Sequence, residues 1–253
     1  MKIILKYIFT NVKERKTRTA VMLLSILLST TLLFVSFSIG ASYESAQRKM
    51  ARGMAGSATL SVSAVDGGID FSVLPELSSI SAGVGMLESS ALYHENGYYE
   101  TIDLIAADLT QLDQINPPRL ANGGEITDFT GNQVILPDRF TSKYGMKAGD
   151  TITLQIGGQP ITLGVAGIAA YDTVFLRHTR GATALLPLST LSELSGKTDG
   201  YTEILIEPAG GTTTAELKNE LVAALPDGEY KVSEVVNEAQ ITADARQNPC
   251  RFS

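Results

Sequence analysis

The sequence is poor in residues that form covalent or metal-bound frameworks. Its 253 residues include no tryptophan, one cysteine (Cys250) and two histidines (His94 and His178). A single cysteine excludes an internal disulfide framework. The histidines lie in separate segments without the spacing of zinc ligands, and we expect no metal or cofactor. Stability must therefore come from noncovalent packing alone.

The signature motifs of common enzymes are also missing. Ser195-Gly-Lys-Thr198 resembles the end of a P-loop, but such a loop needs glycine where this chain has Leu191. Gly83-Val-Gly85 lacks the third glycine of a dinucleotide-binding loop, and no G-x-S-x-G motif marks a nucleophilic serine. We therefore expect a protein that is not an enzyme. A hydrolase that depends on His94 and His178 is the alternative.

Charged residues are absent over the twenty-five positions from Thr19 to Tyr43. Within them, Ala20–Ile39 reads AVMLLSILLSTTLLFVSFSI, with twelve Leu, Ile, Val or Phe residues against six Ser and Thr. As a helix, these residues span about 30 Å, the thickness of the hydrocarbon core of a bilayer. The apolar side chains outweigh the hydroxyl groups in transfer free energy. The sequence therefore predicts a transmembrane helix at 19–43.

The charges on either side indicate the orientation of this helix. The first eighteen residues carry one acidic side chain, Glu14, and a basic cluster of six: Lys2, Lys6, Lys13, Arg15, Lys16 and Arg18. The rest of the chain holds fourteen basic and twenty-six acidic residues. Cationic segments beside a membrane span stay in the cytoplasm. We expect the N-terminus in the cytoplasm and residues 44–253 outside it.

A cleaved signal peptide is the alternative to a membrane anchor. Ser38-Ile39-Gly40 offers a small-x-small cleavage site. However, the apolar stretch exceeds the roughly 7–15 residues of a signal-peptide core, and the segment before it is long. These two features favour the anchor.

The first eighteen residues also have helical periodicity. Leu5, Ile8, Phe9 and Val12 occupy one face of a helix, and the lysines of the basic cluster occupy another. This pattern predicts an amphipathic helix at 1–18 that lies in the inner interface and contacts anionic membrane lipid. The alternative is an ordinary cationic topology signal with accidental periodicity.

Small residues recur on one face of the predicted transmembrane helix. This helix-packing seam consists of Ser25, Ser29, Ser36 and Gly40, at spacings of four, seven and four. Small side chains let a second helix approach closely, so we predict further transmembrane helices as partners. Alternatively, the Ser and Thr hydroxyls only bond carbonyl groups of their own helix.

The part of the chain after the span mixes strand and helix patterns, which predicts an α+β domain at 57–240 behind a stalk at 44–56. Asn96-Gly97 and Gly157-Gly158 each separate two alternating runs and predict β-hairpins. Residues 241–253 are polar and irregular. The acidic composition argues against nucleic acid as a partner.

Helix signals are clearest at three places in this domain. Thr213 and Glu216 match a capping box. Short helices before Gly145 and Gly196 would end at these glycines, which adopt the left-handed conformation readily. Residues 108–124, with Asn116-Pro-Pro, are expected to be rich in loop.

Several segments, taken in order, carry a family resemblance. Before the span, YIFTNVKERKTRT (Tyr7–Thr19) combines an asparagine-containing amphipathic segment, basic residues and an Arg-Thr pair. In the exterior part follow VILPDRFTSKYG (Val134–Gly145), AGDTITLQIGGQPITLGVAGI (Ala148–Ile168) and ALLPLST (Ala184–Thr190). The order is a strand, a short helix ending in glycine, a Gly-Asp-x-Ile strand with a hairpin, and a Pro-Leu-Ser helix start. Over most of residues 1–236 the chain resembles MacB/FtsX-type ABC transporter permeases with a MacB-like periplasmic core domain.

The resemblance implies porter-like βαβ units and a smaller β-rich subdomain around 137–180. It also implies a bacterial inner membrane, a cytoplasmic ATP-binding cassette ATPase as partner, and a second permease copy that completes a dimer. ATP hydrolysis by the partner would move the exterior domain, for export, lipoprotein or peptide handling, or mechanotransmission to a cell-wall enzyme. Permeases of this family have further transmembrane helices after the domain, so we expect a truncated permease or a fragment. The second hypothesis is a stand-alone membrane-anchored binding module.

Overall fold

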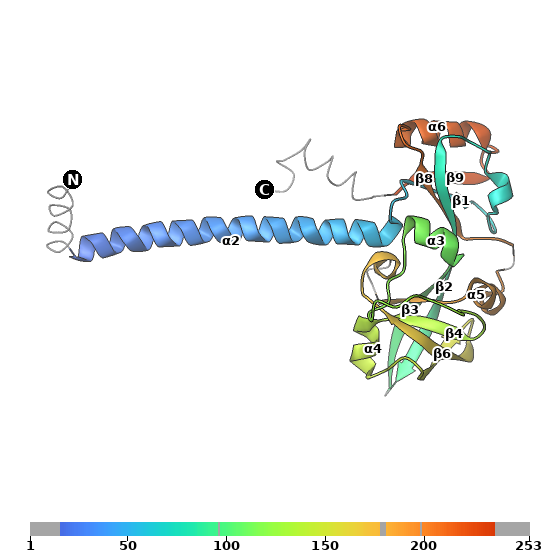
Figure 1. Cartoon of the computed structure of the whole chain (residues 1–253), viewed down its shortest axis with the longest axis horizontal. Helices are drawn as coiled ribbons and strands as arrows, with labels where there is room; N and C mark the ends of the chain where they lie inside the picture. The colour runs from blue at the N-terminus through green and yellow to red at the C-terminus, as the bar shows by residue number, and fades with distance from the viewer. Residues whose placement is uncertain (1–15, 96, 178–180, 198, 236–253) are drawn as a thin grey trace. The chain divides into compact units, whose positions relative to one another are not determined.

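A computed structural model describes residues 16–95, 97–177, 181–197 and 199–235 of the chain. The chain separates into two units, Met1–Gln47 and Arg48–Ser253 (Figure 1). The first unit is described from Lys16 onward, where the long helix α2 (Lys16–Ala55) begins. The predicted amphipathic helix at 1–18 therefore lies almost entirely outside the described residues.

Helix α2 forms because its forty residues contain no proline and no glycine before Gly40. In the described part of the chain, its segment Lys16–Gly40 is the one helix long and apolar enough to cross a membrane. Large apolar side chains point outward all along this segment, and Phe37 is 75% exposed. Such a surface needs an apolar surrounding, which agrees with the membrane helix predicted from the sequence.

The second unit combines strands with short helices, as predicted for an α+β domain. Its strands are β1 (Leu60–Ala64), β2 (Ile80–Glu95), β3 (Tyr98–Ala106), β4 (Gln133–Pro137), β5 (Thr151–Ile156), β6 (Gln159–Ala169), β7 (Ala182–Leu185), β8 (Glu203–Pro208) and β9 (Tyr230–Glu234). Its α-helices are α3 (Leu109–Ile115), α4 (Asp138–Tyr144), α5 (Leu188–Ser195) and α6 (Thr214–Ala224), and its 3₁₀ turns are η1 (Phe71–Val73) and η2 (Thr173–Leu176).

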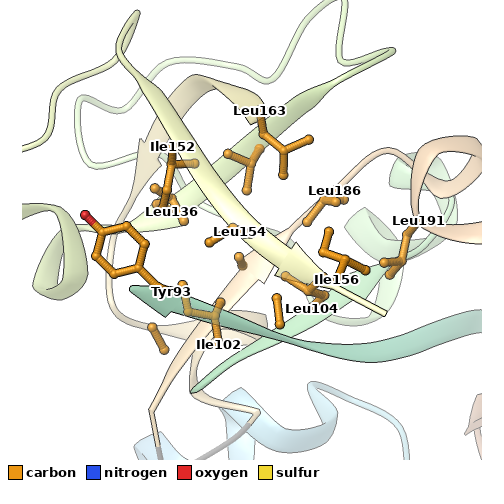
Figure 2. Close-up of a cluster of buried hydrophobic side chains, with 14 of the residues drawn as sticks. Tyr93, Ile102, Leu104, Leu136, Ile152, Leu154, Ile156, Leu163, Leu186 and Leu191 are labelled. Carbon is orange, nitrogen blue, oxygen red and sulfur yellow. The ribbon is translucent and has the colours of Figure 1, made fainter. Parts of the chain in front are cut away.

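One group of strands closes into a barrel. Strands β2, β3, β7, β4, β6 and β5 pair in that cyclic order, because β2 also pairs with β3. The inward residues alternate along the strands, and Leu104, Leu136 and Leu154 are fully buried in the barrel core (Figure 2). Closure removes the free edges of these strands and gives the barrel its own hydrophobic core.

The remaining strands form a second sheet that shares β2 with the barrel. Its order is β2-β8-β1-β9, with every pair antiparallel. Helix α6 covers one face and buries Leu217 and Leu221 against Leu60 and Ile206. Thr213 and Glu216 form the predicted capping box at the start of α6, which satisfies N–H groups that the helix itself leaves open.

Strand β2 passes from one part to the other within two residues. Up to Met86 it pairs with β8, and from Leu87 it pairs with β3. A third cluster of buried residues lies beside this crossing and includes Val84 from β2, Ile115 from α3 and Phe175 from η2. The two parts of the domain therefore pack against a shared core near the middle of β2.

Local predictions in the domain are confirmed at most positions. β2 and β3, and β5 and β6, form antiparallel hairpins around the predicted turns. Helices α4 and α5 end at Gly145 and Gly196, both at φ +68°. The expectation of a loop at 108–124 was wrong for its first half. Helix α3 begins there because the Asp108 side chain accepts hydrogen bonds from the N–H groups of Thr110 and Gln111.

Candidate functional site

The last turn of α2 belongs to the second unit and is fixed there by the domain. We call the residues that hold it, Asn116, Thr173, Leu176 and Arg177, the α2 seat. They come from the end of α3 and from the η2 turn. The last four carbonyl groups of a helix have no partner within the helix, so the end of α2 needs outside donors.

Gly53 allows α2 to approach the seat closely. A Cβ atom at this position would lie 2.1 Å from the Cβ of Leu176 and 2.7 Å from the carbonyl oxygen of Thr173. Three residues later Gly56 adopts φ +62° and ends the helix. A Cβ there would lie 2.0 Å from the carbonyl oxygen of Ile115. Both glycines are therefore required for contact, and Gly56 also for its backbone conformation.

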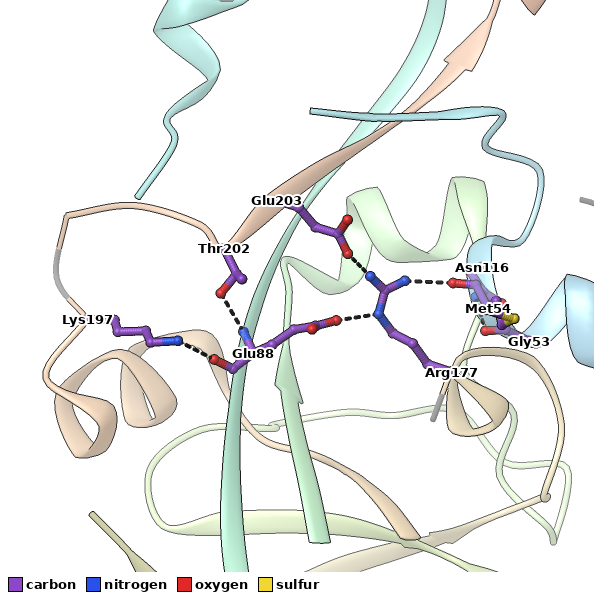
Figure 3. A network of polar contacts seen from close by, with 8 residues as sticks. All are labelled: Gly53, Met54, Glu88, Asn116, Arg177, Lys197, Thr202 and Glu203. Atoms are coloured by element: carbon purple, nitrogen blue, oxygen red, sulfur yellow. Dashed lines mark hydrogen bonds and ion pairs between the residues drawn. The ribbon is translucent and has the colours of Figure 1, made fainter. Parts of the chain in front are cut away.

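Asn116 supplies one of the donors for the end of α2. It follows Ile115 as the C-cap of α3, and its backbone N–H bonds the carbonyl of Leu112 at 2.7 Å. Its side-chain Nδ2 donates to the carbonyl oxygen of Gly53 at 3.1 Å (Figure 3). Asn116 is only 1% exposed, so this hydrogen bond lies in a dry environment where its loss would be costly.

Arg177 supplies the second donor and reaches two further elements. Its Nη1 donates to the carbonyl oxygen of Met54 at 2.6 Å, while Nε and Nη2 form ion pairs with Glu88 and Glu203 (Figure 3). The cation thus stands at the C-terminus of α2, where the helix dipole is negative. Because Glu88 lies on β2 and Glu203 on β8, one guanidinium joins α2 to both strands.

The backbone of Glu88 is held in place from the other side. Its N–H donates to Thr202 Oγ1 at 3.0 Å, and its carbonyl accepts from Lys197 Nζ at 2.8 Å (Figure 3). Glu88 follows the crossing point of β2 by two residues, so these bonds fix the place where barrel and second sheet meet. Lys197, the lysine of the P-loop-like tetrapeptide, therefore donates to a main-chain carbonyl.

A second polar cluster lies between β3 and α4. Glu100 accepts hydrogen bonds from Lys143 Nζ and Tyr144 Oη, both at 2.5 Å. Burial alone would raise the pKa of Glu100, but these bonds outweigh it and the pKa lies below its ordinary value. The pKa of Tyr93 is raised by burial and by its bond to Glu95. The contacts of Glu100 join β3 to α4, whereas the bond between Tyr93 and Glu95 lies within β2. Both sets of contacts are structural.

The sequence-predicted residues lie elsewhere. In the basic cluster, Lys2, Lys6, Lys13 and Arg15 lie outside the described residues, and Lys16 and Arg18 lie on the exposed first turn of α2. The seam residues Ser25, Ser29, Ser36 and Gly40 are exposed on α2. The Thr30 hydroxyl donates to the carbonyl of Ile26 at 2.9 Å. This is the hydrogen bond within the helix that was the alternative explanation for its hydroxyl groups.

The residues of the α2 seat were not predicted from the sequence. Asn116 was assigned to a loop, and Arg177 and Glu88 carried no motif. The one available signal was Gly53 close to Gly56 at the expected stalk, since paired glycines at a helix end indicate close approach. His94 stacks on Tyr99 with ring centroids 4.4 Å apart, and His178 lies outside the described part of the chain.

Comparison with known proteins identifies the fold. The family model of the MacB-like periplasmic core domain matches residues 19–224. The periplasmic region of MacB from Actinobacillus actinomycetemcomitans superposes with a TM-score of 0.51 at 14% identity, over 77% of this chain and 95% of that region. The extracellular domain of the ABC-type transporter YknZ from Gram-positive bacteria gives a TM-score of 0.47 at 14% identity, over 69% and 99%.

A search of curated proteins returned no match. At 14% identity the MacB superposition shows the fold alone, and it agrees with the family match over most of the chain. An apolar N-terminal helix followed by this domain makes a membrane-anchored chain with an extracytoplasmic part. The chain belongs to the family of MacB-like periplasmic core domains of ABC transporter permeases.

Proposed function

We propose that the chain is the N-terminal part of a permease subunit of an ABC transporter. In this function it is not an enzyme. It passes movement from a cytoplasmic ATP-binding cassette ATPase to the extracytoplasmic domain, for export or for handling a lipoprotein or peptide. The observation that carries the proposal is the α2 seat, where Arg177 bonds the Met54 carbonyl and pairs with Glu88 and Glu203.

The seat has the properties that such a transmission needs. A helix is a stiff element because its backbone hydrogen bonds run along its axis. At its end, Asn116 and Arg177 bond the carbonyls of two successive residues, Gly53 and Met54. Displacement of this turn would pull on β2 and β8 together, so movement would reach barrel and second sheet at once.

The last described residue of the domain lies beside the segment that follows α2. Strands β1 and β9 pair antiparallel with Leu60 opposite Glu234, and the Val235 N–H donates to the Thr59 carbonyl at 2.9 Å. Val235 therefore lies close to the end of α2. A segment that is tied to the strand after α2 would follow a movement of the last turn of α2, which suits a domain driven from the membrane.

The orientation and partners complete the proposal. The basic cluster at 1–18 favours a cytoplasmic N-terminus in the bacterial inner membrane, where lysines contact anionic lipid. The seam of Ser25, Ser29, Ser36 and Gly40 supplies a face for further transmembrane helices. A second permease copy would complete a dimer, as the family resemblance implies.

Co-purification from mild detergent tests the proposal. Tagged full-length protein should recover an ATP-binding cassette subunit whose ATPase activity elutes with it. Replacing Ser29 and Gly40 by leucine blocks the seam and should reduce recovery several-fold. The matched control replaces Thr31 and Val35, outside the seam, by leucine and should not. Recovery of the chain without any ATPase, from a cell that expresses one beside it, would instead favour the stand-alone binding module.

A further inference from the structure

The backbone of the α2 seat is strained at Thr173. This residue has φ +46°, in the left-handed region. A β-branched side chain is a genuine outlier there, because its Cβ crowds the backbone. Asp128, at φ +51°, is the other non-glycine residue with positive φ among the described ones. Aspartate tolerates this conformation better, and Asp128 lies in an exposed loop.

The same seat leaves buried oxygen atoms without hydrogen bonds. Thr173 Oγ1 and Asn116 Oδ1 are buried and have no partner within the described chain. Thr173 is 6% exposed and Asn116 1%, so bulk water does not reach them freely. Unsatisfied buried polar atoms weaken the arrangement that holds them. Asp172, which precedes the turn, makes no side-chain cap for η2.

The strained residue Thr173 lies in the turn that contacts the last turn of α2. The carbonyl oxygen of Thr173 is one of the atoms that a Cβ at Gly53 would strike, at 2.7 Å. Arg177, four residues later, closes η2 through its N–H bond to the Val174 carbonyl at 3.2 Å. The backbone angle at Thr173 therefore sets the position of both the surface that contacts Gly53 and the guanidinium that bonds Met54.

We propose that Thr173 is a positioning residue that makes the α2 seat a release point. The η2 turn can detach from α2 and so free its last turn. The free energy needed for this local opening is lower than that needed to open any strand of the barrel. Left-handed strain at a non-glycine residue persists only where the surroundings enforce it, and such residues gather at switch regions. The use of this release in transport rests on the proposed function, whereas the release itself is a property of the chain alone.

Two substitutions separate strain from the loss of side-chain contacts. Thr173→Ala and Thr173→Gly both remove the methyl and the unsatisfied hydroxyl, but only glycine adopts φ +46° without strain. The difference between the two variants therefore measures the free-energy cost of the left-handed backbone conformation at position 173. Asp128→Ala and Asp128→Gly form the matched pair at the other strained position, away from the seat.

Amide hydrogen exchange of the full chain in detergent micelles, without any ATPase, is the test. The Phe175 and Arg177 N–H groups, which bond Asp172 and Val174, should exchange faster than the Val165 N–H in the wild type. In Thr173→Gly they should exchange at least about fivefold more slowly than in Thr173→Ala. The Asp128 pair should leave these two amides unchanged.

Equal exchange of Phe175 in the two Thr173 variants would overturn the proposal, as would exchange of η2 and the barrel strands at a single common rate. A functional readout follows in the ATPase complex. Thr173→Gly should reduce the ATP-dependent movement of the domain, whereas Asp128→Gly should not. Failure to recover an ATPase contradicts the proposed function and leaves the exchange result intact, so the two failures are distinguishable.

Discussion

Arg177 Nη1 donates a hydrogen bond to the carbonyl oxygen of Met54 at 2.6 Å, and this bond joins the last turn of α2 to the rest of the domain. The same guanidinium pairs with glutamates of β2 and β8 and is only 11% exposed in its side chain. A largely buried guanidinium with three partners in three elements is not equivalent to the flexible point charge of a lysine.

Removal of the Arg177 cation should destabilise the domain strongly. In Arg177→Met, Glu88 and Glu203 both lose this partner while remaining largely buried, which should cost about 3 kcal/mol of unfolding free energy. Arg177→Lys should cost less, because lysine keeps the positive charge. It should still cost something, because lysine lacks the several N–H donors of the guanidinium. Urea unfolding followed by circular dichroism in detergent measures the difference.

The matched control for this prediction is Lys218→Met. Lys218 pairs with Glu234 at 2.8 Å, but both side chains are well exposed. Such pairs contribute little, so the loss should stay below about 1 kcal/mol. A cost for Arg177→Met no larger than that of Lys218→Met would contradict the importance of the seat.

A methyl group at Gly53 should displace the end of α2. Gly53→Ala places its Cβ against Leu176 and the Thr173 carbonyl, at 2.1 and 2.7 Å, which should cost about 2 kcal/mol. Gly40→Ala is the control on the same helix, since nothing lies within 4 Å of a Cβ there. It should leave stability unchanged or raise it by up to about 1 kcal/mol, because alanine is the better helix former. The difference between the two effects on unfolding free energy is the test, and equal effects would refute close approach.

Substitution of Asn116 by aspartate should make stability depend on pH. Asn116→Asp replaces the donor to Gly53 by a buried carboxylate that faces a carbonyl oxygen at the negative end of α2. The introduced carboxyl would have a raised pKa in the fold, so stability should fall as the pH rises above about 4. We expect a loss of about 3 kcal/mol at pH 7 that shrinks towards pH 4.

Asn122→Asp serves as the control for this substitution. Asn122 is exposed, and its Oδ1 accepts a hydrogen bond from the Gly124 N–H at 2.9 Å. A carboxylate at this position can accept the same bond. Thermal melts of both variants at pH 4 and pH 7 provide the comparison. A pH-independent loss in Asn116→Asp would show that the hydrogen bond to Gly53 does not form.

The Glu100 cluster should stabilise the domain at neutral pH and not in acid. The pKa of Glu100 is lowered from 4.5, so its contribution is present above that value and is lost as the pH falls through the lowered pKa. Glu100→Gln should therefore cost about 1 kcal/mol at pH 7 and much less at pH 3. Urea midpoints at the two pH values measure this, and in a Lys143→Met background the cost at pH 7 should shrink. An equal cost at both pH values would contradict the account of this cluster.

Local chemistry made much of the fold predictable. The capping box of Thr213 and Glu216 and the glycine ends at Gly145 and Gly196 depend on residues within one turn of each other. The hairpin around Gly157-Gly158 depends on alternation over a few residues on each side. The membrane helix follows from a long apolar run next to cations. At these positions interactions between residues close in sequence determine the local structure, so the sequence alone was sufficient to predict it.

The α2 seat was not predictable because it is assembled from distant residues. Asn116 Nδ2 and the Gly53 carbonyl come from positions 63 apart, and Arg177 and Met54 from positions 123 apart. No periodicity marks such contacts, since they depend on how β2 crosses from β8 to β3. Parallel pairing of β3 with β7, which places η2, is likewise a long-range event. The basic cluster and the helix-packing seam remain predictions.

Distance measurements between spin labels test the central claim that Arg177 fixes the last turn of α2 to both parts of the domain. With Cys250→Ser as background, one label at position 50 on α2 is paired with a second at position 153 on the barrel or 231 on the second sheet. All three positions are exposed. We predict narrow distance distributions in the wild type and in Lys218→Met, and broadening of both in Arg177→Met. A folded Arg177→Met protein whose two distributions stay as narrow as in the wild type would contradict the claim.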